Sequence, residues 1–281
     1  MPLISGDVWV ISSGIEQQIK AKIEAIGTPL KDWNLNINRG IVTGFNDAFI
    51  IDTETKERLC LADPKSTEVI KPVLRGCDIK RYEAKWAELW VIATFPALHL
   101  NIDDYPAVRD FLRTFGKRLE QTGEDGCRKK TCNQWFEIQD TVAYYKEFEE
   151  EKIAWGNLAL NPQYSLIAKG VHINAPCPLI TPANKYVLAV LNSPVSDYYI
   201  RKLGVTRNGG YFEYKPMFIE QLPIPKIPES EQQPFIKLVD EILADKKAGN
   251  DTSALEREID VLVYGLYGLS DEEIAIVEGG K

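Results

Sequence analysis

Apolar residues recur at helical spacing in several stretches of the chain. One stripe is formed by four isoleucines, Ile15, Ile19, Ile23 and Ile26. It predicts an amphipathic helix that begins at a capping box, Ser13-Gly-Ile-Glu16, and ends at Gly27. Similar patterns predict helices in three further segments, 104–121, 185–192 and 195–203.

Shorter apolar runs between these segments predict strands. Glu88–Phe95 is apolar and rich in β-prone residues, which is typical of a buried strand. Ala48–Asp52 and Arg58–Leu61 predict the two strands of a hairpin, with a polar turn at Thr53–Lys56 between them. Asp63-Pro64 has the form of an N-cap followed by the first position of a short helix. The mixture of both patterns predicts an α+β fold.

A proline-rich segment, Leu222–Pro228, separates this mixed region from a helical one. Its prolines cannot continue a helix because they lack the backbone N–H. Beyond them, apolar stripes predict two helices, and Ser270–Glu273 has the form of a cap for a third. We therefore expect a small helical appendage at the C-terminal end.

The charged residues are unevenly distributed. The net charge is −8, and the whole excess lies in residues 228–281, which hold 5 Lys and Arg against 13 Asp and Glu. Residues 106–135 hold 7 basic and 4 acidic residues. A basic face can therefore grip phosphates although the protein as a whole is acidic.

The composition excludes several classes of protein. Apolar residues make up 44% and charged residues 26%, which is typical of a globular chain rather than a disordered or collagen-like one. The sequence has no apolar run of bilayer length and no signal-peptide pattern, so we expect a cytoplasmic protein without membrane contact. Five scattered cysteines favour reduced thiols over a disulfide framework.

Two kinds of motif suggest catalysis, each with an ordinary alternative. Asn161-Pro-Gln-Tyr164 approximates the Asn-Pro-Pro-Tyr loop of amino-group DNA methyltransferases. No glycine-rich cofactor loop precedes it, and the pattern favours a turn before a strand. Asp140 with Glu150-Glu-Lys152, and Asp52 with Glu54-Thr-Lys56, mimic a magnesium-dependent nuclease pattern. The alternatives are a solvated helix end and a hairpin turn. We expect no complete catalytic centre and no metal site.

Four stretches, taken in order, carry a resemblance to a known family. They are Arg39–Asp52, Ile70–Tyr82, Trp135–Gln139 with the helix and basic loop before it, and Tyr186–Ser193 with Gly209–Tyr214 and Glu220–Pro225. Their order and spacing resemble the TaqI-like C-terminal specificity domain. This is the target-recognition domain of type IIG restriction–modification enzymes and related adenine-N6 DNA methyltransferases.

The resemblance implies an organisation and a function. It implies a mixed α+β target-recognition domain at 28–228, a helical lead-in at 1–27 and an acidic helical tail at 229–281. The domain would bind duplex DNA in the major groove by sequence, as the C-terminal part of a longer polypeptide with a methyltransferase core. That parent would need S-adenosylmethionine, and Mg²⁺ if it also cleaves DNA. The present chain is expected to need neither.

Several side chains in these stretches are candidates for DNA contact. Asn46 follows the turn Thr43-Gly-Phe45, and its amide suits an adenine edge, although a plain strand-entry turn is the alternative. Arg75 and Arg81 are candidates for phosphate or guanine contact. Arg75 is equally placed to pair with Asp78.

The main phosphate-contact candidates are the cations of segment 106–135. Arg109, Arg113 and Lys117 recur every four residues, which suits either a phosphate-facing ridge or an ordinary solvated surface. The loop after this helix adds Arg128, Lys129 and Lys130.

A second candidate surface is the turn at 207–211. Arg207, Asn208 and Tyr211 suit the reading of base edges, and they equally suit an ordinary hairpin. We expect this turn and the basic loops to converge on a single face wide enough for a double helix. Two other functions stay open: a divergent DNA methyltransferase or nuclease that uses the motifs above, and a protein-interaction module that docks through its acidic tail.

Overall fold

A four-stranded antiparallel sheet forms the middle of the molecule in the computed structural model, which describes residues 14–279. Its strands, in spatial order, are β10 (Tyr164–Ile167), β8 (Lys152–Trp155), β12 (Pro178–Thr181) and β2 (Asn36–Arg39). Successive residues of a strand face opposite sides. Ile153 and Trp155 therefore enter one hydrophobic core and Ala154 enters another.

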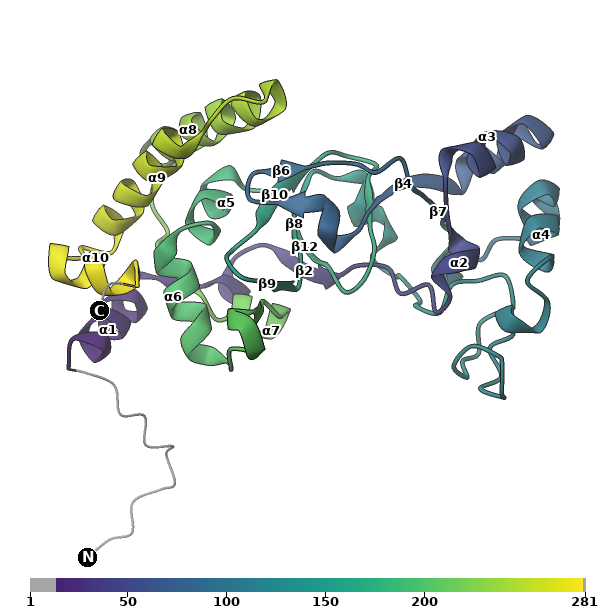
Figure 1. The fold of residues 1–281 in the computed structure, drawn as a ribbon, viewed down its shortest axis with the longest axis horizontal. Coiled ribbons are helices and arrows are strands. Elements are labelled where there is room, and N and C mark those ends of the chain that lie inside the picture. Colours follow the sequence, from purple (N-terminus) through teal and green to yellow (C-terminus); the bar gives the residue numbers. More distant parts are fainter. Residues whose placement is uncertain (1–13, 280–281) are drawn as a thin grey trace, which may run out of the picture.

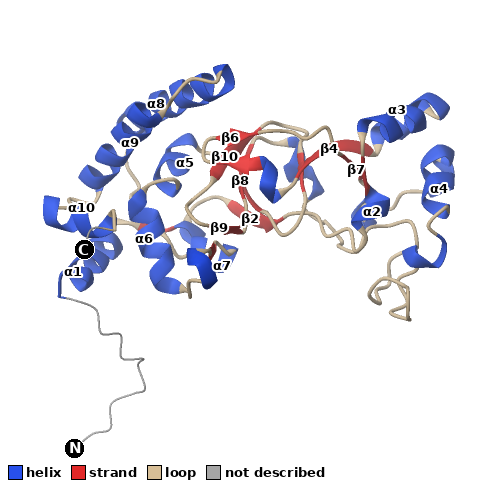
Figure 2. Cartoon of the chain, viewed as in Figure 1, coloured by secondary structure: helices blue, strands red, loops and turns tan. Residues whose placement is uncertain are grey.

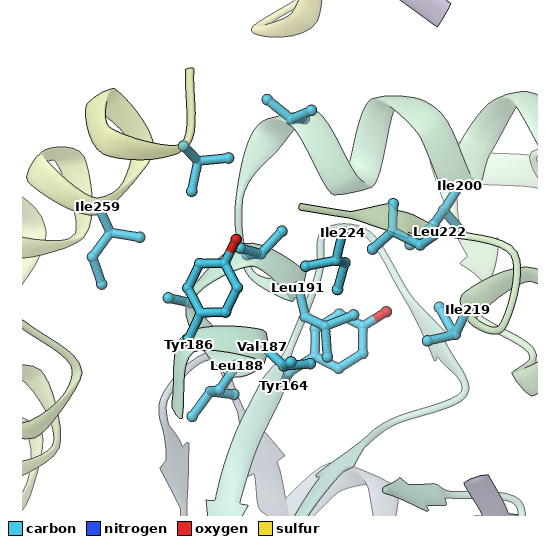
Figure 3. Packing of buried hydrophobic residues seen from close by; sticks show 14 of the residues in the cluster. Tyr164, Tyr186, Val187, Leu188, Leu191, Ile200, Ile219, Leu222, Ile224 and Ile259 are labelled. Atoms are coloured by element: carbon cyan, nitrogen blue, oxygen red, sulfur yellow. The ribbon is translucent and has the colours of Figure 1, made fainter. Parts of the chain in front are cut away.

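The first core lies between this sheet and a layer of helices. The helices are α1 (Gly14–Ile26), α5 (Lys185–Leu191), α6 (Pro194–Leu203), α8 (Glu229–Ala248), α9 (Ser253–Leu266) and α10 (Asp271–Val277). Figure 3 shows side chains of this core, such as Tyr164, Tyr186 and Ile224, packed together. The C-terminal helices thus share a core with α5 and α6.

The second core belongs to the opposite end of the molecule. A small sheet there has the order β11 (His172–Ile173), β4 (Ile70–Leu74), β7 (Trp90–Ile92) and β3 (Ile50–Ile51). The helices of this end are α2 (Asn46–Phe49), α3 (Thr53–Ala62) and α4 (Pro106–Arg113). Figure 1 shows α8–α10 at one end of an elongated molecule and α2–α4 at the other, and Figure 2 shows the strands between them.

Short elements complete the fold. The strand pairs are β1 (Thr28–Pro29) with β14 (Pro223–Ile224), β5 (Ile79–Lys80) with β6 (Glu83–Ala84), and β9 (Leu158–Ala159) with β13 (Phe212–Glu213). Helix α7 spans Pro216–Ile219. The 3-10 helices span Leu30–Asp32, Pro64–Glu68, Gly76–Asp78, Pro96–Leu98, Ile102–Asp104, Gly116–Leu119, Tyr145–Glu149 and Asn208–Gly210.

The predicted hairpin at 48–61 is wrong. Its second half is helix α3, because the Asp52 carboxylate accepts a hydrogen bond from the Thr55 backbone N–H at 2.8 Å and so caps a helix at the position taken for a turn. The predicted helix at 104–121 is shorter than expected. It ends at Arg113, and Gly116 takes a φ of 56°, after which a 3-10 turn buries Leu119.

Other local predictions are confirmed. Asp63 caps the 3-10 helix that starts at Pro64, and helices α5 and α6 match the two predicted segments. Ser270 and Glu273 form the predicted capping box of α10. The predicted cap at Ser13 lies outside the described residues. All five cysteines are free. Within residues 14–279, no helix is both long and apolar enough to cross a bilayer.

Candidate nucleic-acid interface

The turn that precedes α2 forms one wall of a surface hollow. Gly44 has a φ of 77°, and an added Cβ there would lie 2.6 Å from the Gln139 side-chain oxygen, so the turn requires glycine. The hollow has a volume of about 430 Å³ and is lined by residues 41–46, Asn174 and Ala175. Asn46 is exposed, and its side-chain oxygen accepts a hydrogen bond from the Thr43 hydroxyl at 2.6 Å.

Arg128 supports this turn from inside the protein. Its side chain donates to the backbone carbonyls of Leu119, Thr43 and Trp135 at 2.7–3.0 Å. The residue is only 4% exposed, and burial lowers the pKa of its guanidinium to about 10. These contacts favour a structural role for Arg128 over the predicted phosphate contact, because its hydrogen bonds hold three loops together.

One exposed cation, Arg118, contacts the same turn, and four others lie on the segment around it in sequence, 113–130. The Arg118 guanidinium lies 4.2 Å from the centre of the Phe45 ring and 3.8 Å from Asp47. Arg113 lies over the Trp135 ring, and Lys117 donates to the Asp125 carbonyl at 3.5 Å. We call the set formed by Arg113, Lys117, Arg118, Lys129 and Lys130 the basic surface; all five residues are exposed.

The basic surface is distinguished by how few carboxylates it meets. Within residues 14–279, only Arg118 of its five members has a carboxylate within ion-pair distance, and that contact is the long one to Asp47. The acidic helices α8–α10 lie at the far end of the molecule (Figure 1). The acidic excess therefore lies at one end of the long axis, and the basic surface lies at the end that carries α4.

Three other predicted cations are held in ion pairs. Arg75 makes two hydrogen bonds to Asp78, at 3.1 and 2.9 Å, as the alternative interpretation expected. Arg81 contacts Glu256 at 2.6 Å and Asp260 at 3.5 Å, and so fastens α9 to the chain before β6.

Arg109 of α4 is also paired. It contacts both Asp103 and Asp110 at 2.9 Å, which raises its pKa. These contacts favour structural roles for the three arginines.

The turn at 207–211 lies apart from the basic surface. Arg207 pairs with Glu213 at 3.0 Å, whereas Asn208 and Tyr211 are exposed. The turn leads into β13 and α7, beside the first core, and α4 belongs to the second. In Figure 1, α7 lies near the middle of the molecule, away from α4. The two predicted surfaces are therefore separate parts of the molecule, and their convergence on one face stays a prediction.

The motif Asn161–Tyr164 has a structural explanation. Tyr164 is fully buried on β10, its ring lies 5.2 Å from that of Trp155, and its backbone N–H donates to the Asn192 side chain. This tyrosine cannot stack on a base without leaving the core. The interpretation of the motif as a turn before a strand fits these contacts.

The residues of the nuclease-like patterns are engaged separately. Lys152 is buried and donates to the Ala168 carbonyl at 3.0 Å, and burial lowers its pKa to about 8. Glu150 pairs with Lys169, and Asp140 pairs with Arg39. In the described part of the chain, no group of three His, Cys, Asp or Glu side chains is arranged to hold a metal ion.

Two residues near the hollow, Arg118 and Asn174, were not predicted from the sequence. Arg118 lies one position beyond the four-residue ridge that drew attention to its neighbours, and its place over Phe45 depends on the fold. Asn174 follows strand β11 and reaches the turn because Ile41 and Asn174 form a parallel bridge. No local signal marks Asn174, because it lies more than a hundred residues from the other wall of the hollow.

Comparison with known proteins gives concordant results. The TaqI-like C-terminal specificity domain matches residues 71–224, more than half of the chain. The type II methyltransferase M.PaeR7I of Pseudomonas aeruginosa is 23% identical over 289 aligned residues, which cover 96% of this chain and 45% of that protein. The type II methyltransferase M.MjaIV of Methanocaldococcus jannaschii is 22% identical over 238 residues, which cover 80% of this chain and 76% of that protein.

Solved structures share the fold. The type IIL restriction-modification enzyme MmeI, solved in complex with DNA, superposes with a TM-score of 0.60 at 12% identity, over 89% of this chain and 35% of that one. The type IIG restriction endonuclease BpuSI gives 0.53 at 15% identity, over 91% and 33%. The chain thus spans less than half of M.PaeR7I and about a third of each solved enzyme. On the match over residues 71–224, this chain belongs to the family of TaqI-like C-terminal specificity domains.

Proposed function

We propose that this chain is a DNA target-recognition domain that binds duplex DNA through the end of the molecule carrying α2 and α4. The observation that carries the proposal is the basic surface, one of whose cations, Arg118, contacts Phe45 at the hollow that Asn46 also lines. Phosphate contacts would set the position of the duplex, and side chains at the hollow would read base edges.

The exposed cations of the basic surface are available to bind phosphate, and this supports the proposed DNA-binding surface. A cation that is already neutralised by a neighbouring carboxylate gives up that pair when it meets a phosphate, so it adds little net attraction. Arg75, Arg81 and Arg109 are of this kind. Lys117, Lys129 and Lys130 can instead replace the counterions of the duplex directly, which gives a salt-dependent gain in affinity.

The distribution of charge also favours one orientation. Helices α8–α10 carry the acidic excess and lie opposite the basic surface along the long axis (Figure 1). A duplex drawn to the basic surface is therefore repelled from the C-terminal helices. This arrangement leaves that end free for protein contacts.

We further propose that the domain serves a methyltransferase core in a longer polypeptide. Both curated relatives are named type II methyltransferases, and the chain spans only part of each. S-adenosylmethionine would then be the cofactor of that core, with Mg²⁺ added if the polypeptide also cleaves DNA. In this arrangement the present chain contributes binding and positioning of the target site, and the core contributes the chemistry.

The proposal is tested by the salt dependence of DNA binding. Removing three phosphate contacts by Lys117→Ala, Lys129→Ala and Lys130→Ala should lower the slope of log affinity against log salt concentration by about 2.7, at about 0.9 per contact. Affinities for selected and random duplexes should fall together. Fluorescence anisotropy at several salt concentrations measures both quantities.

A matched triple variant controls for net charge. Lys20→Ala, Lys85→Ala and Lys237→Ala remove the same charge from exposed sites, and these three lysines lie near Glu24, Glu83 and Glu241. Their loss should leave the slope within the error of the unchanged chain. Equal slopes for the two triple variants would refute the assigned surface, and a chain that binds no duplex at low salt would refute the function.

A further inference from the structure

We propose that the hollow beside α2 is a base-reading site, in which the carboxamides of Asn46 and Asn174 bind the edge of one nucleobase. The inference rests on the proposed function and names the part of the interface that supplies specificity. The two asparagines line the same hollow of about 430 Å³, from segments that are distant in sequence. Neither the family match nor the relatives assign a role to this hollow.

Asn174 is the first observation that points to a ligand. It is only 6% exposed, and its backbone is fixed, since its N–H donates to the Leu74 carbonyl at 2.9 Å. Its side-chain amide makes no hydrogen bond to any residue in 14–279. Its amide atoms are not among the fully buried polar atoms that lack a partner, so they face the hollow from an otherwise buried side chain. An amide that lines a hollow without a protein partner is well placed to bind a group that enters from outside.

Asn46 supplies a second amide in a fixed orientation. The Thr43 hydroxyl accepts the Phe45 backbone N–H at 3.1 Å and donates to the Asn46 side-chain oxygen at 2.6 Å. This arrangement turns the Asn46 NH₂ group away from Thr43 and leaves both of its N–H donors available. The Thr43 carbonyl is held in turn by Arg128 at 3.0 Å, so Thr43 and Arg128 are positioning residues for Asn46.

The chemistry of the hollow suits a base edge better than a phosphate. Two neutral carboxamides offer donors and acceptors together, which matches the mixed pattern of a base edge in the major groove. A phosphate offers only acceptors and would leave the Asn174 carboxamide oxygen without a donor. An exposed cation, Arg118, lies over Phe45 at the hollow, where a phosphate of the same duplex would pass.

The backbone keeps the hollow in place without help from either amide. The Ile41 N–H donates to the Ile173 carbonyl at 2.7 Å, and the Ala175 N–H donates to the Ile41 carbonyl at 2.9 Å. These bonds join the two walls. Removing the Asn174 side chain therefore breaks no hydrogen bond of the fold. A loss of DNA selectivity in such a variant would reflect a binding role of Asn174 and not a structural one.

The experiment begins with selection of the preferred duplex from a random pool by the unchanged chain. Asn174→Ala and Asn46→Ala should each lower the ratio of selected to random affinity by about 5- to 150-fold, the range of one base-edge contact. The slope of affinity against salt should not change, because no phosphate contact is lost. The thermal midpoint of Asn174→Ala should equal that of the unchanged chain. Asn250→Ala, on the acidic helical end, is the control and should alter nothing.

A double variant tests the positioning role of Thr43. Thr43→Val removes the hydroxyl while keeping the shape, and should lower selectivity in the same direction as Asn46→Ala. If Thr43 acts through Asn46, adding Thr43→Val to Asn46→Ala should cause no further loss. Additive losses would overturn the positioning role.

The outcomes separate this inference from the function on which it rests. A chain that selects no duplex overturns the function, and the inference with it. A chain that selects a duplex and keeps its selectivity after Asn46→Ala and Asn174→Ala overturns the base-reading site alone. If Asn174→Ala lowers the thermal midpoint, Asn174→Ser supplies the comparison. A folded serine variant with full selectivity would also overturn the site.

Discussion

Replacing Arg128 distinguishes a structural cation from a DNA-binding one. Arg128→Ala removes four hydrogen bonds and leaves three backbone carbonyls, those of Leu119, Thr43 and Trp135, short of a donor. Each such loss costs about 1–3 kcal/mol when the acceptor is buried. Relief of the guanidinium's own burial and entry of water offset part of this sum. We therefore expect the free energy of unfolding to fall by about 3–5 kcal/mol.

Urea denaturation followed by tryptophan fluorescence measures this loss, since Trp135 lies beside the site. Lys129→Ala is the matched control. Its side chain is exposed, so stability should change by less than about 0.5 kcal/mol while DNA affinity falls. The reasoning is refuted if Arg128→Ala costs less than about 1 kcal/mol and lowers the salt slope of DNA binding as Lys129→Ala does. Arg128 would then reach phosphate after all.

Two further predictions concern buried polar groups of the first core. Burial raises the pKa of Asp260 from 3.8 to about 6. The contribution of this carboxyl to the free energy of unfolding is therefore complete below pH 4 and is lost as the pH rises through 6, a fall of about 3 kcal/mol. Asp260→Asn should remove this fall, which urea titrations between pH 4 and 7 measure. Parallel curves for the two proteins would show that burial does not shift this carboxyl. The Tyr164 hydroxyl is buried without a hydrogen-bond partner in the described chain, so Tyr164→Phe should leave the thermal midpoint unchanged or raise stability by up to about 1 kcal/mol. A clear loss would mean that the hydroxyl has a partner.

Local patterns predicted elements where the deciding contacts are also local. Helices α5 and α6 and the capping box at Ser270 depend on side chains within four residues of the backbone groups they satisfy. The hairpin prediction at 48–61 failed because it overlooked a local contact. A single local hydrogen bond, from the Thr55 N–H to Asp52, starts a helix where the polar run Thr53–Lys56 predicted a turn.

The candidate site could be predicted only in part. The richness of segment 106–135 in cations is a property of the sequence, and it predicts the segment that carries the basic surface. The sequence did not separate Arg128 from Lys129, although one is buried and the next is exposed. Asn174 carried no signal, because its importance comes from its nearness to Asn46 in space.

By itself, the sequence determined the family, the mixed composition of helix and strand, and the division between a basic segment and an acidic end. These properties depend on residue types and on short spacings, which folding does not change. The tertiary structure decided which cations are available to a partner. Arg81 is paired with carboxylates of α9, and Arg128 donates its hydrogen bonds to carbonyls of three loops. Lys129 has neither kind of partner in the described chain. An ion pair or a buried hydrogen bond requires a partner within a few ångströms, and only the folded chain brings such partners together.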